Sequence, residues 1–304
     1  MHSLPILDDL PAGYFAEESP RGFLALHIDL ARELHELGYG PEHEGPLADS
    51  DLSGRVKLYQ LEAGGERFVV RRFQHGGVFR WLTRSRYGDP ERPFRELIVS
   101  NALARSGVRT PQVVAARARK AGLVGWQLEI VTRRVEQSWD LAQVLEALRE
   151  GRLSVRARHA LFRAAGGLVR ELHRLGLVHA DLTPRNLLVE ERQLETAEPE
   201  LWILDLDQSV FLPALSDRQR RRNLHRLLRA VLRREARGHR FLARTDFARF
   251  LRGYDAEGRR WQAEWRAVQA DYRRGWFLHQ VGWRLEQALG SGPDTRDGKA
   301  VVRG

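Results

Sequence analysis

The sequence predicts an α+β fold, in which a β-rich first half precedes a larger helical second half. Apolar residues alternate on both sides of the Gly64-Gly65 pair, which is the pattern of a β-hairpin. From Trp139 onward, apolar residues recur with helical spacing. The chain has 304 residues, of which 42% are hydrophobic, and this is enough for one large domain or two small ones.

The composition excludes several classes of protein. Cysteine is absent, so disulfides, thiolate metal sites and cysteine nucleophiles are ruled out. No apolar run reaches the roughly 20 residues needed to cross a bilayer. Residues Met1–Gly13 lack the basic and apolar regions of a signal peptide. We therefore expect a cytoplasmic protein.

The formal net charge is +10, and arginine supplies nearly all of the positive charge. Guanidinium groups pair with phosphate in a two-pronged geometry, so this charge favours acidic partners such as nucleic acid, anionic lipid or a phosphorylated glycan. The sequence contains no zinc-finger spacing and no basic-zipper pattern, so no nucleic-acid partner is expected.

Residues 1–50 mix short apolar patches with five prolines. They are predicted to form an N-terminal extension that packs on a larger body. Leucines at positions 24, 26, 30, 34 and 37 predict a helix over Leu24–Leu37.

The following segment predicts the order β-β-α-β-β. Two strands flank Gly64-Gly65. A helix begins at Pro93, a residue that suits a first helical turn, and ends at Gly107. The predicted strands are Val56–Glu62, Arg67–Phe73, Gln112–Ala116 and Trp126–Val135.

Helices dominate the second half. Ser154 is placed to open a long amphipathic helix, and Gly176 ends it. Two short apolar runs, Leu187–Val189 and Leu201–Leu206, predict a small β-hairpin within the helical half. The remaining chain is predicted to be helical over Ser216–Leu289 and flexible over Gly290–Gly304.

One segment has a recognisable chemical pattern. Residues 178–189 read V-H-A-D-L-T-P-R-N-L-L-V, and a later apolar run ends at Asp205. This matches the H-x-D-L-x-x-x-N loop and the later metal-binding aspartate of protein-kinase-like phosphotransferases. In that chemistry one carboxylate accepts or orients the proton of the acceptor hydroxyl, while a carboxamide and a second carboxylate hold magnesium on the nucleotide phosphates. Asp181 is therefore the candidate base, and Asn186 and Asp205 are the candidate magnesium ligands.

His179 is predicted to be a structural residue that packs and hydrogen-bonds the catalytic loop.

The β-rich half should then supply the nucleotide clamp. Phe68-Val69-Val70-Arg71 has the shape of the V-A-I-K motif, with arginine in the lysine position, so Arg71 is the candidate phosphate cation. Lys57, on the preceding predicted strand, is the alternative. Glu96 is placed on the next helix to pair with the strand cation. Backbone amides near Gly54 are the candidate phosphate cradle.

The adenine-facing hinge is expected at about Thr132 to Val135, by position along the chain.

Several of these segments together resemble the lipopolysaccharide kinase family, which includes the 3-deoxy-D-manno-octulosonic acid (Kdo) kinases and the core heptose kinases. The resemblance covers roughly residues 50–235. The segments are Arg67–Gly77, Pro93–Leu97, Thr110-Pro111 and His179–Leu188. The N-terminal extension, and Val56 where a second loop glycine is expected, depart from the family pattern.

The resemblance implies a protein-kinase-like two-lobed fold, with a small β-rich N-lobe and a larger helical C-lobe. It also implies ATP and Mg²⁺ as cofactors, and phosphorylation of a sugar hydroxyl of the lipopolysaccharide inner core on lipid A at the inner face of the cytoplasmic membrane. It supports the roles given above to Asp181, Asn186, Asp205, Arg71 and Glu96. The expected organisation is an N-terminal extension (1–50), an N-lobe that clamps the nucleotide (51–135), a C-lobe with the catalytic loop and acceptor site (136–289), and a flexible tail (290–304).

Other functions share the same three catalytic groups. A small-molecule or protein kinase with a different acceptor is one alternative, and a nucleotide-binding pseudokinase scaffold is another. The arginine-rich helix predicted from Asp217 is either an ordinary lobe helix with solvated arginines or a surface for peripheral contact with anionic lipid. Two interpretations are also open for the tryptophans near the C-terminal end, which either pack in the core or form a belt at a membrane interface. These are Trp261, Trp265, Trp276 and Trp283.

Overall fold

The computed structural model describes residues 4–50, 58–74, 86–122, 125–235 and 242–255, together with residues 262, 263, 266, 267 and 270. The chain divides into two compact units, Met1–Trp261 and Gln262–Gly304. All the helices and strands named below belong to the first unit.

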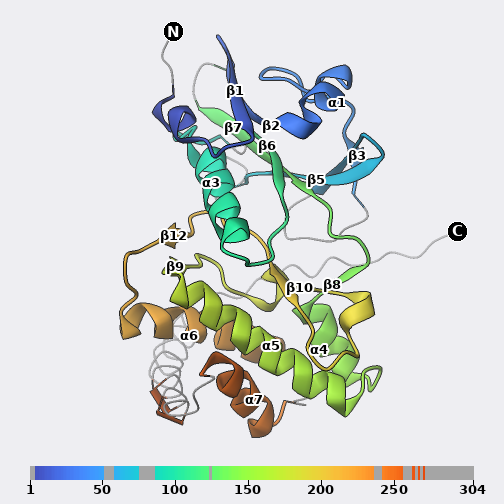
Figure 1. The fold of residues 1–304 in the computed structure, drawn as a ribbon, viewed down its shortest axis with the longest axis vertical. Helices are drawn as coiled ribbons and strands as arrows, with labels where there is room; N and C mark the ends of the chain where they lie inside the picture. Colours follow the sequence, from blue (N-terminus) through green and yellow to red (C-terminus); the bar gives the residue numbers. More distant parts are fainter. Residues whose placement is uncertain are drawn as a thin grey trace, which may run out of the picture. The chain divides into compact units, whose positions relative to one another are not determined.

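A seven-stranded antiparallel sheet forms the β-rich half (Figure 1), with the strand order β1-β2-β6-β7-β5-β4-β3. The predicted β-β-α-β-β order is confirmed, with the helix α3 at Arg92–Arg105 and the hairpin turn at Gly64-Gly65. The strands are β1 (Tyr14–Ser19), β2 (Gly22–His27), β3 (Ala48–Asp49), β4 (Leu58–Ala63), β5 (Glu66–Arg72), β6 (Val113–Lys120) and β7 (Trp126–Arg133).

The helix predicted over Leu24–Leu37 is wrong in its first part. Residues 24–27 belong to strand β2, and only Ala31–Glu36 form the α-helix α1, after a short 3₁₀ turn at Ile28–Leu30. Strand β2 lies between β1 and β6 and is buried on both faces. A strand of that kind has no alternation of polar and apolar residues, so its leucines were indistinguishable from the start of the helical pattern.

Residues 4–50 contribute to the core on both faces of this sheet. On one face, the 3₁₀ helix η1 (Pro5–Asp9) and α3 pack over Phe23 and Ile130. On the other face, Leu30 and Leu34 pack with Phe68 and Val131.

A buried ionic network fixes the segment after α1 to the sheet. Glu129 on β7 and Arg117 on β6 are only 3% and 2% exposed, and their side chains form an ion pair at 2.8 Å. The Tyr39 hydroxyl donates to Glu129 at 2.6 Å, and Arg72 donates to the other carboxylate oxygen of Glu129 at 3.2 Å. Arg117 also donates to the carbonyl of Gly40. Each charge is therefore matched, as a buried ion requires.

The helical half contains α4 (Leu141–Arg149), α5 (Val155–Arg174), α6 (Asp217–Glu235) and α7 (Arg244–Tyr254) (Figure 1). Ser154 caps α5 by accepting from the Ala157 amide at 3.0 Å, and Gly176 follows its end at φ +82°, as predicted. The predicted hairpin is present as β10 (Leu187–Glu190) paired with β11 (Leu201–Ile203). Strand β8 (Ser138–Asp140) pairs with β10 on its other side.

The apolar side of α6 is buried, with Leu224, Leu227 and Leu228 each less than a tenth exposed. This side of α6 is therefore core. Up to Asp255, the region predicted to be helical over Ser216–Leu289 contains α6 and α7. Most of its remainder lies outside the described residues, and so do Trp261, Trp265, Trp276 and Trp283.

Two glycines allow a close crossing of α5 and α7. A Cβ on Gly166 would lie 1.9 Å from the carbonyl oxygen of Phe250, and a Cβ on Gly253 would lie 2.0 Å from that of Arg163. Any larger residue at either position would push the two backbones apart. The crossing thus fixes α7 on α5.

In the part of the chain that the structure describes, we found no helix with the length and apolar character needed to cross a membrane.

Candidate active site

The catalytic loop begins after strand β9 (Leu177–Val178) and runs through the 3₁₀ turn η3 (Pro184–Asn186) into β10. His179 is 1% exposed at its start. Its Nδ1 accepts from the Asp181 amide at 3.1 Å, so the proton lies on Nε2, which donates to the Leu204 carbonyl at 3.0 Å. Burial lowers the pKa of His179, and the ring is neutral. These bonds connect the loop to the residue before Asp205.

Asn223 on α6 anchors the same loop from the other side. Its carboxamide accepts from the His179 amide at 3.0 Å and donates to the His179 carbonyl at 2.8 Å. The same Oδ1 accepts from Nε2 of His173 at 3.3 Å, and the Tyr254 hydroxyl on α7 bonds Nδ1 of His173 at 2.8 Å. Helices α5, α6 and α7 therefore all support the catalytic loop. No sequence pattern indicates this role for Asn223, which is an ordinary polar residue in an arginine-rich helix.

Asp181 and Asn186 are joined within the loop. The Asn186 Nδ2 donates to the Asp181 carbonyl at 2.7 Å, which turns the carboxamide Oδ1 away from that carbonyl. The Asp181 side chain is about half exposed, and Arg226 on α6 lies 3.8 Å from its Oδ1. Arg226 is a second functional candidate that the sequence did not single out.

Asp205 follows β11 and has a left-handed backbone, with φ +56°. This conformation is uncommon for a residue with a Cβ and costs free energy, and such strain is found mostly at functional sites. Its Oδ1 is buried without a hydrogen bond and lies 3.4 Å from the Arg71 guanidinium. The Leu204 amide bonds the Asn186 carbonyl at 2.9 Å, so the backbones leading to Asp205 and Asn186 lie side by side.

Arg71 and Glu96 form the ion pair that their spacing predicted, at 2.5 Å between Nη2 and Oε2. Burial alone would lower the pKa of Arg71, but Glu96, Asp205 and Asp207 outweigh burial and raise it. Burial raises the pKa of Glu96 to about 7, Asp205 and Asp207 act in the same direction, and Arg71 opposes them. Because Arg71 also contacts Asp205, one guanidinium links β5, α3 and the end of β11.

A second link between these elements was not anticipated from the sequence. Arg92, the first residue of α3, forms a two-pronged ion pair with Asp207, and its Nε lies 2.6 Å from Oδ1. Its guanidinium also stacks over Tyr87, with 5.0 Å to the ring centroid. The position of α3, and with it Glu96, is thus tied to the segment after Asp205.

The remaining predicted site residues are placed as follows. Thr132 is in β7 beside Val69 of β5, and Val135 lies in the four-residue connection between β7 and β8 that joins the sheet to the helical half. The Val135 carbonyl accepts from the Ser138 hydroxyl at 2.8 Å. Gly54 and Lys57 lie outside the described residues, as does the Gly76-Gly77 pair.

The chemistry of Asn186 and Asp205 fits magnesium. Among the described residues, no group of three or more histidine, aspartate and glutamate side chains forms a metal site. Mg²⁺ in phosphotransferases is bound by one or two protein oxygens together with substrate phosphates and water, so it does not need such a cluster. The Oδ1 of Asp205, which is buried and accepts no hydrogen bond, is the kind of oxygen that a metal cation would satisfy.

The fold and these residues together define a protein-kinase-like phosphotransferase. The family model of the lipopolysaccharide kinase (Kdo/WaaP) family matches residues 50–254. The chain belongs to this family. It is a kinase of the lipopolysaccharide core, a phosphotransferase with an alcohol group as acceptor.

Two curated relatives support this family assignment. A 3-deoxy-D-manno-octulosonic acid kinase of Actinobacillus succinogenes is 31% identical over 65% of this chain and 79% of its own length. A kinase of the same name from Stenotrophomonas maltophilia is 30% identical over 77% of this chain and 91% of its own length. A solved structure of WaaP in complex with acyl carrier protein matches with a TM-score of 0.53 and 23% identity, over 75% of this chain and 86% of that one, which supports the kinase-like fold.

Proposed function

We propose that the protein transfers the γ-phosphoryl group of ATP, with Mg²⁺, to a hydroxyl of a 3-deoxy-D-manno-octulosonic acid residue on lipid A. The observation that supports this most is the contact between the two halves of the molecule at the site. Arg71 of β5 bonds Glu96 of α3 and lies 3.4 Å from Asp205, so the phosphate cation and a metal-binding carboxylate face each other. The names of the relatives favour this acceptor over a core heptose.

In this proposal, Asp181 accepts the proton of the acceptor hydroxyl as the hydroxyl oxygen bonds to the γ-phosphorus. The bond between that phosphorus and the β–γ bridging oxygen breaks, and ADP leaves. A half-exposed carboxylate is suited to this role because the acceptor can reach it from solvent. His179, neutral and bonded on both ring nitrogens, only holds the loop.

Arg71 would pair with the α- and β-phosphates, and Glu96 would hold Arg71 in position. Asn186 Oδ1 and the Asp205 carboxylate would hold magnesium, which when bound neutralises charge on the β- and γ-phosphates. Backbone amides near Gly54 would cover the phosphates, and the segment from Thr132 at the end of β7 to Val135 would contact adenine. Lys57 is the alternative phosphate cation.

Arg226 has a place in the acceptor site. An octulosonic acid has a carboxylate on the same residue as its hydroxyls, and a guanidinium binds a carboxylate strongly. Arg226 lies 3.8 Å from Asp181, which would receive the hydroxyl proton. We therefore assign Arg226 to recognition of the acceptor carboxylate. Its weak contact with Asp181 would be replaced when the acceptor binds.

We also propose that residues 51–135 act as the nucleotide lobe, together with the strands that residues 1–50 add to its sheet, and that residues 136–289 act as the acceptor lobe. The predicted tail, 290–304, lies outside the described residues. The acceptor is a membrane-anchored glycolipid, so the enzyme would work at the inner face of the cytoplasmic membrane, in peripheral contact with anionic lipid. The net charge of +10 supports this contact.

The test is mass spectrometry of defined acceptors after incubation with the purified protein, ATP and Mg²⁺. Three acceptors are compared: a lipid A precursor with octulosonic acid, the same precursor without it, and a dephosphorylated heptose-bearing core. The proposal expects a gain of one phosphate group on the first acceptor only, and none when the metal is chelated. If only the heptose-bearing core gains a phosphate group, the acceptor is a core heptose and the proposed acceptor is wrong. If none of the three acceptors gains a phosphate group, the proposed reaction is contradicted.

A further inference from the structure

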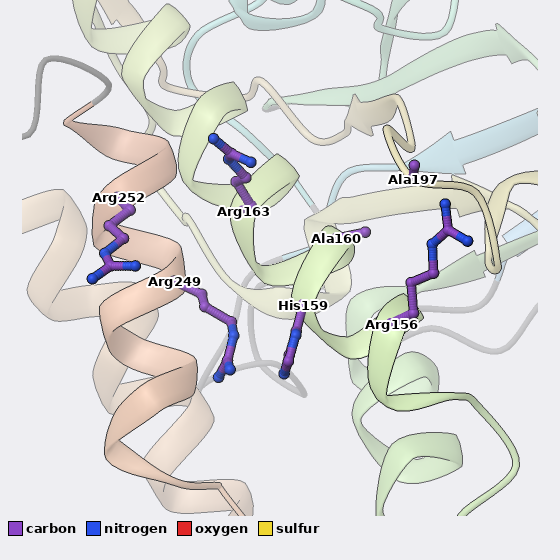
Figure 2. A pocket seen from close by; sticks show the side chains of 7 residues that line it. All are labelled: Arg156, His159, Ala160, Arg163, Ala197, Arg249 and Arg252. Atoms are coloured by element: carbon purple, nitrogen blue, oxygen red, sulfur yellow. The ribbon is translucent and has the colours of Figure 1, made fainter.

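A basic groove lies between α5 and α7, away from the catalytic loop. Its cavity volume is about 330 Å³. Four arginines and a histidine line it, as Figure 2 shows, and these are Arg156, His159 and Arg163 on α5 and Arg249 and Arg252 on α7. In the figure, His159 and Arg249 point from their two helices toward the same space. No described carboxylate lines the groove.

The groove is built on a rigid frame. The glycine crossing at Gly166 and Gly253 brings α7 against α5, with Gly253 directly against the backbone of Arg163. Asp246 near the start of α7 is 1% exposed and forms a two-pronged ion pair with Arg158, at 2.9 Å and 2.5 Å. Both ends of α7 are therefore in close contact with α5, and the lining side chains start from two tightly packed helices.

Among the described residues that line the groove, four are arginines and none is a carboxylate. Asp246 is the acid closest in sequence to Arg249, and their contact is long, at 3.7 Å. Asp246 is already occupied by Arg158 and by the Ala243 amide. His159 of α5 and Arg249 of α7 point toward the same space (Figure 2), and an anion placed there would accept hydrogen bonds from both side chains.

We propose that this groove binds a phosphate group. Phosphate offers three or more acceptor oxygens, and guanidinium groups bind it through paired hydrogen bonds. The site is separate from the catalytic site, because His159 and the end of α5 at Arg174 are about 20 Å apart along the helix. The phosphate comes either from a lipid headgroup or from a soluble phosphate.

Two measurements distinguish these sources. The first is sedimentation of the full chain with vesicles of phosphatidylcholine, with and without anionic phosphatidylglycerol. The second is calorimetric titration with inorganic phosphate. The test variant is Arg249→Gln/Arg252→Gln, and a second, Arg156→Gln/Arg163→Gln, reaches the groove from the other helix. The control is Arg105→Gln/Arg170→Gln, which removes two exposed arginines outside the groove and loses the same charge.

Both test variants should weaken binding by about tenfold or more relative to the control, because each removes two guanidinium groups from the groove. A loss confined to anionic vesicles assigns the groove to a lipid headgroup, and a loss confined to inorganic phosphate assigns it to a soluble phosphate. Equal binding by the test variants and the control in both measurements would overturn the proposal. Folding is checked by helix content, and phosphate transfer to the acceptor is measured separately, so failure of the groove and failure of the proposed kinase reaction are distinguishable.

Discussion

Asn223 holds the backbone of His179 from both sides, accepting from its amide and donating to its carbonyl at 3.0 Å and 2.8 Å. The two residues are 44 positions apart, and both are almost fully buried. If the Asn223 side chain is removed, the buried amide and carbonyl of His179 both lose their hydrogen-bond partner.

Asn223→Ala should destabilise the protein by about 1 to 3 kcal/mol for each buried group left unbonded. Phosphate transfer should fall while nucleotide affinity is retained, because Arg71 and Glu96 are untouched. Asn223→Asp keeps the acceptor for the His179 amide and should lose less. Urea unfolding and a transfer assay measure the two effects. A transfer rate in Asn223→Ala equal to wild type would show that this anchor is not needed.

The Arg71 and Glu96 ion pair gives a second prediction. Glu96→Gln leaves the Arg71 guanidinium without its closest counter-charge and free to turn toward Asp205. We expect nucleotide affinity to fall by about tenfold or more, which corresponds to about 1.4 kcal/mol per factor of ten. Glu91→Gln is the control, because Glu91 pairs with Arg95 at the same end of α3 but outside the site. Equal nucleotide Kd values for the two variants would contradict this role of Glu96.

Arg226 is predicted to affect acceptor binding more than the chemical step. Arg226→Gln should raise KM for an octulosonic acid acceptor by about 10- to 100-fold, as expected for loss of one charge-assisted hydrogen bond of about 1.5 to 3 kcal/mol. The KM for ATP should not change. Arg222→Gln, at an exposed position one turn earlier on α6, is the matched control. With an acceptor whose carboxylate is converted to an amide, wild type and Arg226→Gln should have similar KM values. If the difference in KM is as large as with the carboxylate, Arg226 does not contact this group.

The buried network around Glu129 is predicted to stabilise the β-rich half. Glu129→Ala leaves Arg117 buried without its carboxylate, which typically costs about 3 to 5 kcal/mol. Glu62→Ala removes an exposed glutamate from β4 and should have little effect. Urea denaturation compares the free energies of unfolding. A loss below about 1 kcal/mol for Glu129→Ala would mean that the network contributes little.

His173 predicts how stability depends on pH. Burial lowers the pKa of His173 from its usual 6.5 to about 4 in the folded protein. Between these two values the unfolded chain binds a proton that the folded protein does not. This contribution to the free energy of unfolding therefore falls as pH drops through this window, by up to about 1.4 kcal/mol per pH unit. The measurement is urea unfolding at several pH values. His173→Gln should have a smaller slope than wild type between pH 6.5 and 4, and the prediction is wrong if the two slopes are the same.

Short-range patterns explain what could be predicted from the sequence. The hairpin at Gly64-Gly65, the cap at Ser154 and the loop from His179 to Asn186 all depend on residues close together in the chain, and all were located correctly. The pairing of Arg71 with Glu96 followed from the known order of elements in a kinase-like fold. Strand β2 was missed because a strand buried on both faces has no alternating pattern.

Contacts between distant segments could not be predicted. Arg92 and Asp207 are 115 positions apart, and nothing in one sequence distinguishes this arginine from the many solvated ones. The same holds for Asn223 and Arg226, whose roles depend on where α6 packs beneath the catalytic loop. Gly166 and Gly253 were ordinary helix glycines in the sequence, and only the crossing of α5 and α7 explains them.

The most direct test of the central claim compares wild type with Asp181→Asn in a single-turnover assay of phosphate transfer from ATP to an octulosonic acid acceptor. Nucleotide Kd is measured alongside. Asparagine keeps the size of the side chain but cannot accept the hydroxyl proton. We predict a rate lower by about 10²- to 10⁴-fold with an unchanged nucleotide Kd. An Asp181→Asn protein that transfers phosphate at the wild-type rate would contradict the assignment of Asp181 as the base, and with it the account of the site.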